Sequence, residues 1–383
     1  MFLLAFLALI FLVAQPCDIP GAPLPPGITP KKAEEGWIAL FDGKSTYGWK
    51  TVGHAKLNNG VLTMGGEQEA SLTSTTHFAS FEFVMSYRLE GKEGGFQFTC
   101  GDKQVGKKET TIAPSNEFKD FTLGMPNNSK TGSITITTNP GTTLHIKSIT
   151  LKPLGAKSIF NGKDLSGWKE IPGRKSKFSV TSNGELNVKD GNGDLQTIDQ
   201  WDDFVLQMDI ISNGDHLNSG VFFRSLPGEF WSGYEAQVRN EWNTTVKLKD
   251  GTSITGSLTF KGDDAEVKAG RQSKKFKRSD IESMMDHRDK PIDFGSGGIY
   301  HHCPARTVVT TDRQWYTMTV IAHGNHIAVW VNGYQTAEFT DNRPVNKSAR
   351  RGRKDDAGCL SIQGHDPTTD LSFRNIRIAA LPK

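Results

Sequence analysis

The chain has 383 residues, enough for two domains that each bury a core, and it carries 45 Lys and Arg against 42 Asp and Glu. A net charge of +3 makes nucleic acid a poor default partner, and the four cysteines form no C-x-x-C pair, so neither a zinc site nor a disulfide framework is indicated. Forty glycines, and runs of Val, Ile, Thr and Phe broken by turn residues, favour an all-β protein.

The N-terminal region indicates export. Residues 2–14 are uncharged and apolar, too short for a membrane span of about 20 residues but suited to a secretory signal peptide, which we place at residues 1–17. Removal of this segment would leave no membrane span and an exported protein, periplasmic or at the cell surface. The proline-rich residues 18–35 then predict an extended linker without core content. A Cys303–Cys359 disulfide and two free thiols both remain open.

An internal duplication organises the rest of the chain. Residues 38–50 (I-A-L-F-D-G-K-S-T-Y-G-W-K) recur as residues 157–169 (K-S-I-F-N-G-K-D-L-S-G-W-K), and the strand-like residues 144–154 recur at 371–381. The repeats predict one unit over residues 36–155, which lacks counterparts of several later motifs, and a longer unit over residues 156–383.

The most informative stretch of the second unit is 218–240, which predicts two strands joined by a Leu-Pro-Gly turn. In the second strand Tyr234 alternates with Glu235 and Gln237, and Phe230 and Trp231 precede it in the turn. The first strand places Arg224 on the same parity as Phe222. A carboxylate, an amide, a guanidinium and aromatic rings are what a sugar-binding cleft needs, although a solvated strand face would have a similar pattern.

An insertion interrupts the second unit at about residues 243–290. Its strand, Asp-Gly turn and second strand at 245–260, followed by the basic residues 271–278, predict a small β-barrel of the SH3 or Sm type. The insertion has eleven Lys and Arg against eight Asp and Glu, so the basic balance of the chain is local to it. We interpret it as a solvated accessory module rather than a nucleic-acid binder.

Later strands add further polar candidates. Gln363 and His365 share one face of the strand at 360–365, and Tyr300 ends a glycine-rich strand before two histidines. On a curved sheet, Arg224, Glu235, Gln237, Gln363 and His365 would converge. A carboxylate with a histidine gives either an acid–base pair or part of a metal site, and a water-filled groove without catalysis is the alternative.

The second unit resembles the 3-keto-disaccharide hydrolase domain family of the concanavalin A-like lectin and glucanase superfamily. The residues that carry the resemblance are F-N-G-K-D-L-S-G-W (160–168), N-S-G-V-F-F-R (218–224), G-Y-E-A-Q-V (233–238), G-G-I-Y (297–300), W-Y-T-M-T-V (315–320), V-N-G (331–333) and I-Q-G-H (362–365), with the closing strand to 378. The first unit resembles only the beginning and end of the family pattern. Asn240 and Gly364 stand where such proteins often carry acidic residues.

This resemblance implies two jelly-roll β-sandwich units that act on glycosides or disaccharides oxidised to a ketone at C3. His365 or Glu235 would remove the C2 proton, the C1 substituent would be eliminated, and water would then add. Arg224 or a divalent metal would stabilise the enolate, and Gln237, Tyr234, Gln363, Tyr300 and Trp231 would bind the sugar. A carbohydrate-binding surface module without catalysis is the alternative, and a structural repeat protein without a ligand is the third.

Overall fold

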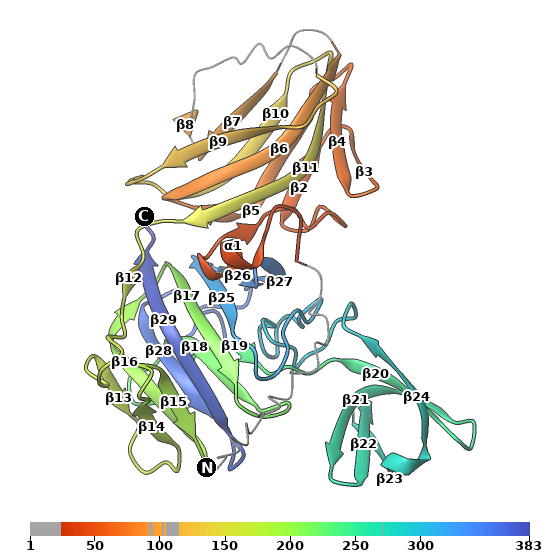
Figure 1. Cartoon of the computed structure of the whole chain (residues 1–383). Helices are drawn as coiled ribbons and strands as arrows, with labels where there is room; N and C mark the ends of the chain where they lie inside the picture. Colours follow the sequence, from red (N-terminus) through yellow and green to blue (C-terminus); the bar gives the residue numbers. More distant parts are fainter. Residues whose placement is uncertain (1–23, 92–94, 102, 105–114, 270) are drawn as a thin grey trace, which may run out of the picture.

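The computed structural model describes residues 24–91, 95–101, 103–104, 115–269 and 271–383, and the predicted signal peptide lies outside these ranges. Most of the described chain forms antiparallel β-sheets: two sandwiches and a smaller curled sheet (Figure 1). This confirms the predicted all-β class. Among the described residues, no helix is long and apolar enough to span a membrane.

The first unit is a sandwich of two sheets. One sheet has the order β3 (Ala55–Asn58), β4 (Val61–Gly66), β11 (Thr142–Pro153), β6 (Phe81–Gly91) and β9 (Lys119–Met125), with β1 (Ile38–Ala39) paired to β11. The other has the order β2 (Trp49–Val52), β5 (Ser71–Phe78), β10 (Gly132–Thr138), β7 (Phe96–Cys100) and β8 (Lys103–Gln104). Alternate residues of β6 are buried between the sheets, as the period of two predicts.

The second unit repeats this architecture, and within the described residues its larger sheet has eight strands where that of the first unit has six. Its larger sheet has the order β14 (Lys177–Val180), β15 (Leu186–Lys189), β29 (Asp370–Ala380), β17 (Phe204–Ser212), β25 (Tyr316–His323), β26 (His326–Val331) and β27 (Tyr334–Thr340), with β12 (Lys157–Ser158) paired to β29. The smaller sheet, called the site sheet below, has the order β13 (Trp168–Glu170), β16 (Gly193–Trp201), β28 (Gly358–Gly364), β18 (Ser219–Ser225) and β19 (Tyr234–Val238).

The repeated F-[DN]-G-K…G-W motif has the same structural role in both units. In the first unit the indole N–H of Trp49 donates to the carbonyl oxygen of Leu40, and in the second Trp168 donates to Ile159 at 2.8 Å, nine residues upstream in each case. The buried tryptophan thereby closes the loop that starts each sandwich, which explains why the motif survives in a unit that has lost other family motifs.

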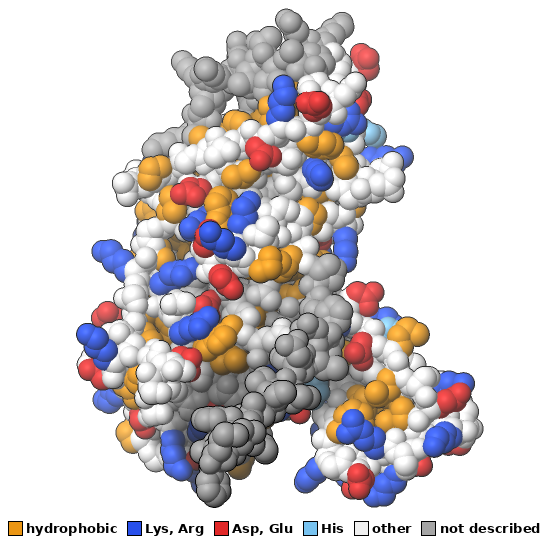
Figure 2. Space-filling view, in the orientation of Figure 1, with side chains coloured by type: hydrophobic (Ala, Val, Ile, Leu, Met, Phe, Trp, Pro, Cys, Tyr) orange, Lys and Arg blue, Asp and Glu red, His pale blue; other side chains and the backbone are white. Residues whose placement is uncertain are grey.

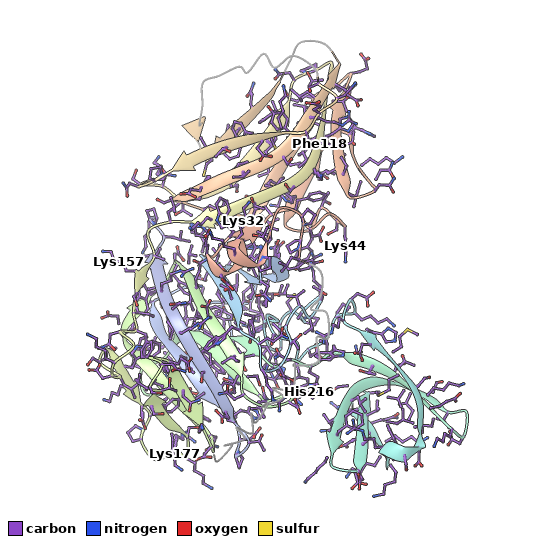
Figure 3. The ribbon with its side chains drawn as sticks, viewed as in Figure 1. Lys32, Lys44, Phe118, Lys157, Lys177 and His216 are labelled. Atoms are coloured by element: carbon purple, nitrogen blue, oxygen red, sulfur yellow. The ribbon has the colours of Figure 1, made fainter. Side chains whose placement is uncertain are left out.

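The two sandwiches pack against each other. Trp330 and Ile321, from strands of the larger sheet in the second unit, are buried in one apolar cluster with the core of the first unit. The indole N–H of Trp330 donates to the carbonyl oxygen of Ala39 at 3.0 Å. Arg306 adds an ion pair with Asp42 across the same boundary. Figure 3 shows Lys44, two residues after Asp42, at this junction. The predicted division near residue 155 falls between β11 and β12.

The described part of the predicted linker differs from the sequence expectation. Residues Pro30–Glu34 form a short helix, α1, which the Thr29 side chain caps by accepting from the Lys32 amide at 3.2 Å. Ile28 and Ala33 are buried together with Trp37 rather than solvated. Packing of Ile28, Ala33 and Trp37 therefore fixes this segment onto the sandwich.

The insertion forms a separate five-stranded sheet with its own small core. The sheet has the order β23 (Gln272–Lys277), β22 (Asp264–Ala269), β21 (Ser253–Lys261), β20 (Asn243–Leu248) and β24 (Ile281–His287), with the 3-10 helix η1 (Arg278–Asp280) before the last strand. Its strong curvature matches the predicted small barrel (Figure 1). In the space-filling view it stands out as a lobe with many basic side chains (Figure 2).

Cys303 and Cys359 are both free thiols, which decides the alternative that the sequence left open. Cys359 is buried in β28, whereas Cys303 is only partly buried and donates to the Pro304 carbonyl at 3.6 Å. Neither contributes a cross-link to the fold.

Candidate active site

The candidate site lies on the face of the site sheet that points away from the core of the sandwich. Strand pairing places Asp194 opposite Gln363 and Gly220 opposite Gln237, and these residues form one row across four strands. Their neighbours in sequence, such as Leu195 and Val221, alternate onto the core face. The row is therefore built from polar residues that are held by a packed sheet, which fixes their backbone positions.

Glu235 lies on β19, an edge strand of the site sheet, and its side chain is on this face. A Cβ atom at Gly220 would come within 2.5 Å of Glu235 Oε1, so the carboxyl group fills the space over that glycine. The residue is only 6% exposed, and its carboxyl group has no hydrogen-bond or ion-pair partner among the described residues. The pKa of Glu235 is raised to about 8, chiefly by burial. The positive charge of Arg350 lowers this pKa in part, and the negative charge of Asp194 raises it.

Asp194 is a second buried carboxyl on the same face. It is 1% exposed, and its Oδ2 accepts a hydrogen bond from the Trp231 amide at 3.0 Å. Burial raises the pKa of Asp194 to about 7, although that hydrogen bond and the charges of Arg174 and Arg350 lower it in part. Asp194 is thus close to half-ionised at neutral pH, whereas Glu235 is mostly protonated.

Four buried polar atoms at the site have no hydrogen-bond partner within the described ranges: Asp194 Oδ1, Ser361 Oγ, Gln363 Oε1 and Trp231 Nε1. Such atoms are rare in folded proteins because each one costs desolvation free energy without compensation. By contrast, Gln237 is held by its own neighbours, since its amide donates to Asn218 Oδ1 at 2.8 Å. These unpaired atoms indicate that a polar ligand binds here and supplies their missing hydrogen-bond partners.

An aromatic wall borders these groups. The loop between β18 and β19 carries Phe230 and Trp231, whose rings stack at 4.3 Å, and the His365 ring stacks on Trp231 at 5.8 Å. Arg174 covers the outer face of Phe230 at 3.9 Å. The side chain of Gln196 fixes the loop by accepting from the Gly228 amide at 2.8 Å. A rigid, partly exposed aromatic surface beside buried polar groups is a common arrangement for binding sugar rings.

Arg350 is the cation of this site. It extends from the loop that precedes β28, where its Nε donates to the Trp231 carbonyl oxygen. Its positive charge lowers the pKa values of Asp194, Glu235 and Tyr300 in part. Being exposed, it can change position when a ligand enters.

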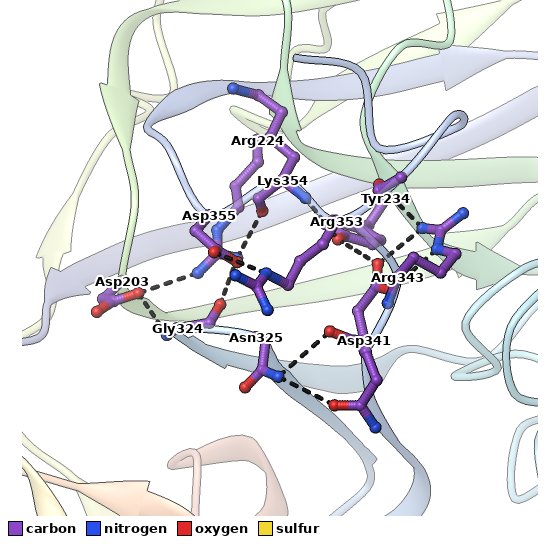
Figure 4. A network of polar contacts seen from close by, with 12 residues as sticks. Asp203, Arg224, Tyr234, Gly324, Asn325, Asp341, Arg343, Arg353, Lys354 and Asp355 are labelled. Atoms are coloured by element: carbon purple, nitrogen blue, oxygen red, sulfur yellow. Dashed lines mark hydrogen bonds and ion pairs between the residues drawn. The ribbon is translucent and has the colours of Figure 1, made fainter. Parts of the chain in front are cut away.

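Arg224 does not take the place that strand parity predicted for it. Its backbone has φ 51°, and the pairing of β18 with β28 shifts register at this point, so the side chain turns away from the site. It is fully buried and donates to the carbonyl oxygens of Asp202 (2.7 Å), Gly324 (2.7 Å) and Lys354 (2.9 Å), and it pairs with Asp203 at 3.0 Å (Figure 4). It is a structural arginine that ties three loops together.

Tyr234 is likewise a core residue. Its ring stacks on Phe223 at 5.7 Å, and its hydroxyl donates to Asp341 Oδ2 at 2.7 Å and accepts from the Lys354 amide at 3.0 Å (Figure 4). Burial raises the pKa of Tyr234 to about 12. This corrects the expectation that it binds substrate, because it points to the opposite face from Glu235.

The other predicted residues lie around the site. His365 is at the end of β28 with its side chain 35% exposed, and its Nδ1 is 2.9 Å from Asp366 Oδ2. The Tyr300 amide donates to the Glu235 carbonyl oxygen at 3.0 Å, and burial together with the Glu235 charge raises the pKa of Tyr300. Gln237 and Gln363 thus lie on one face of the site sheet with Glu235. His365 reaches this face through Trp231, and Tyr300 contacts the backbone of Glu235.

A metal centre does not fit the residues present. Among the described side chains, no three His, Cys, Asp or Glu residues gather in a way that could hold an ion. Asn240 is buried and donates to Asp312 Oδ1 at 2.8 Å, away from Glu235 and Asp194 in the hydrogen-bond network. We therefore derive no step through a metal.

Comparison with known proteins identifies the family. The model of the 3-keto-alpha-glucoside-1,2-lyase-like domain matches residues 36–148 and, separately, residues 155–379. The chain belongs to this family. The match confirms the resemblance inferred from sequence and shows that the first unit is also a copy of the domain. Among curated protein sequences, none matched the chain.

Three solved structures are similar to part of the chain. A candidate glycosyl hydrolase of Parabacteroides distasonis ATCC 8503 is 20% identical, with 59% of this chain and 94% of that chain covered and a TM-score of 0.41. The carbohydrate-binding module CBM66 of Bacillus subtilis is 14% identical, with 56% and 96% covered and a TM-score of 0.33. A lichenase from a mouse hindgut metagenome is 11% identical, with 56% and 93% covered and a TM-score of 0.25.

Proposed function

We propose that the second unit cleaves glycosides whose C3 hydroxyl has been oxidised to a ketone, by elimination followed by addition of water. The observation that carries the proposal is the pair of buried carboxyl groups, Asp194 and Glu235, with pKa values of about 7 and about 8 on one sheet face. Two titratable groups whose environments separate their pKa values are suited to act as base and acid. Family membership supports the substrate class.

The reaction balances with these two groups alone. The base takes the proton from C2, and the electron pair of that bond delocalises onto the C3 ketone oxygen as an enolate. Return of this electron pair forms a C1=C2 double bond, restores the ketone and breaks the bond from C1 to the leaving oxygen, which takes a proton from the acid. Water then adds its hydroxyl to C1 and a proton to C2, and the net result is hydrolysis.

Asp194 is assigned as the base and Glu235 as the acid. Asp194 has the lower pKa and so is more often ionised, and its Oδ1 has no partner among the described residues. Glu235 keeps its proton at neutral pH and can donate it to the leaving oxygen. Asp194 lies two strands away from Gly220, which Glu235 covers, so these two backbone positions are roughly 10 Å apart, with Gln363 on the strand between them.

Arg350 takes the role that sequence reasoning gave to Arg224. Its guanidinium group, whose charge lowers the pKa of both carboxyl groups, can stabilise the negative charge that develops on the enolate oxygen. Trp231 and His365 would bind a face of the sugar ring, and Gln363 Oε1 would accept from one of its hydroxyls. His365 is the alternative base, but its Nδ1 is engaged by Asp366 and its ring by Trp231.

We also propose that the protein is exported. The apolar residues 2–14 support this, although they lie outside the described residues. Fusion of residues 1–17 to a reporter that is active only after export would test it, and retention of the reporter in the cytoplasm would contradict it.

The enzymatic proposal is tested by incubating purified protein with a 3-keto α-glucoside and with the unoxidised α-glucoside, each with and without a chelator. Release of the C1 substituent from the keto substrate alone, unaffected by chelation, is the expected result. Binding of both sugars without turnover would instead indicate a carbohydrate-binding module, which the exposed aromatic rings could also serve.

A further inference from the structure

A cavity lies where the insertion meets the second unit. It has a volume of about 450 Å³, within the usual range for small-ligand pockets, and both parts of the chain contribute to it. The sandwich provides Arg239, Glu241 and Phe294, and the insertion provides Ser257 and Lys268. The proposed reaction does not use this region.

The floor of the cavity is charged and well fixed. Arg239 and Glu241 form an ion pair at 2.5 Å, and the Glu241 side chain is only 6% exposed. Burial raises the pKa of Glu241, while the charges of Arg239, His216 and Lys268 lower it, so a carboxyl and two cationic side chains converge here from both parts of the chain. Ser257 Oγ is buried without a hydrogen-bond partner in the described chain. These groups can donate to and accept from the hydroxyls of a sugar.

Phe294 forms the wall nearest the active site. Its side chain is 37% exposed, and its ring lies 5.6 Å from the ring of Tyr300, whose pKa is raised in part by Glu235. A smaller cavity of about 270 Å³ is lined by both Phe294 and Tyr300. The two rings therefore link the carboxyl groups of the active site to the cavity beside the insertion.

The insertion is held firmly enough to keep this cavity open. Arg288, which follows β24, covers the Trp242 ring at 3.6 Å and donates to the Thr310 carbonyl oxygen at 2.7 Å. The Val308 amide donates to the Arg288 carbonyl oxygen at 3.0 Å. His216, labelled in Figure 3 where the sandwich meets the insertion, contacts the Trp242 ring at 5.5 Å. Both strands that connect the insertion are thus braced against the sandwich.

The insertion also borders the opposite side of the site. A larger cavity, of about 840 Å³, is lined by the insertion and by Thr368, three residues after His365. The insertion therefore flanks the loop that carries His365 as well as the loop that carries Tyr300. An elongated ligand that left the active site in this direction would pass along it.

From this arrangement we propose that the cavity between Phe294 and the insertion binds a further sugar ring of the substrate, on the side of the leaving group. The proposal rests on the function proposed above and adds that the preferred substrate is an oligosaccharide rather than a simple glycoside. Phe294 supplies an apolar face for the ring, and Ser257, Arg239 and Glu241 bind its hydroxyls. The insertion is then a specificity element of the enzyme.

The test compares two keto substrates of different length: methyl α-glucoside oxidised at C3, and maltotriose oxidised at C3 of its non-reducing-end ring. In Phe294→Ala the KM of the trisaccharide is expected to rise about tenfold with kcat nearly unchanged, and the KM of the methyl glycoside is expected to stay the same. Phe294→Trp should keep the low KM for the trisaccharide. Ser257→Ala, on the insertion, should also raise it.

Met285→Ala is the matched control, because Met285 is 62% exposed on the insertion and lines none of the cavities described here. The inference would be overturned if the unmodified protein had the same KM for both substrates. It would also be overturned if the ratio of the two KM values were the same in Phe294→Ala as in the unmodified protein. If neither keto substrate is cleaved, the proposed reaction fails, and calorimetric titration with unoxidised maltotriose decides about the cavity. Binding of maltotriose that is lost in Phe294→Ala and kept in Met285→Ala would support the inference. Absence of maltotriose binding by the unmodified protein would overturn it.

Discussion

Replacement of Glu235 by glutamine is expected to stabilise the fold at neutral pH while it removes activity. Glutamine has nearly the same shape as protonated glutamic acid, but it does not ionise. The folded pKa of Glu235 is about 8, compared with 4.5 for an unperturbed glutamate, so the unfolded chain loses this proton at a lower pH than the folded protein does. Between these two values the carboxyl group lowers the free energy of unfolding as the pH rises.

The size of the effect follows from the shift. pH 7 lies about 2.5 pH units above the unperturbed pKa of 4.5 and below the folded pKa of about 8. At 1.36 kcal/mol per pH unit, the free energy of unfolding of Glu235→Gln should exceed that of the unmodified protein by roughly 3 kcal/mol. Near pH 4 both states are mostly protonated, and the difference should nearly vanish. Loss of the general acid should lower kcat on the order of 100-fold.

Denaturant unfolding at these two pH values, with turnover of a 3-keto-glycoside, measures both effects. Glu229→Gln is the matched control, since Glu229 is an exposed carboxyl in the loop next to the site and should change stability by no more than about 0.5 kcal/mol. If Glu235→Gln is no more stable than the unmodified protein at pH 7, burial does not hold this carboxyl neutral and the acid assignment is refuted.

The pH profile of kcat/KM should be bell-shaped, rising as Asp194 ionises near pH 7 and falling as Glu235 loses its proton near pH 8; a profile that is flat across this interval would contradict the acid–base pair. Arg350→Ala removes a charge that lowers both pKa values, so both limbs of that profile should move to higher pH, and limbs that stay in place would show that Arg350 does not act on the pair. Asp42→Asn leaves Arg306 without its ion-pair partner between the two sandwiches and should destabilise the protein by roughly 3 kcal/mol in thermal or denaturant unfolding; a change below about 0.5 kcal/mol would mean that the pair does not fix the junction.

The architecture was largely predictable because both of its main signals are local. Strand alternation places Glu235 and Gln237 on one face, and Trp49 and Trp168 mark the start of each unit by a hydrogen bond to a residue nine positions earlier. The contact between the units was not predictable in this way. Trp330 lies in a strand that is apolar on both faces. One face packs inside the second unit, but the sequence of the strand does not indicate that the first unit covers the other face.

The site was predictable where strands are regular and not elsewhere. Arg224 was misplaced because a bulge with φ 51° reverses the direction that strict alternation gives. Tyr234 already had the opposite parity to Glu235, so alternation was the better guide than its aromatic character. Asp194 alternates with Leu195 and could have been found by the same rule. Arg350 lies in a loop, where no periodicity exists to predict its direction.

The central claim is that the C2 proton is removed before the C1 bond breaks, and the most direct measurement is cleavage of a 3-keto α-glucoside in D₂O followed by NMR of the product. Elimination and readdition of water should place deuterium at C2 of the released 3-keto sugar faster than in a control without enzyme, and Asp194→Asn should abolish this incorporation. Release of the leaving group with the original proton retained at C2 would show direct hydrolysis and contradict the account.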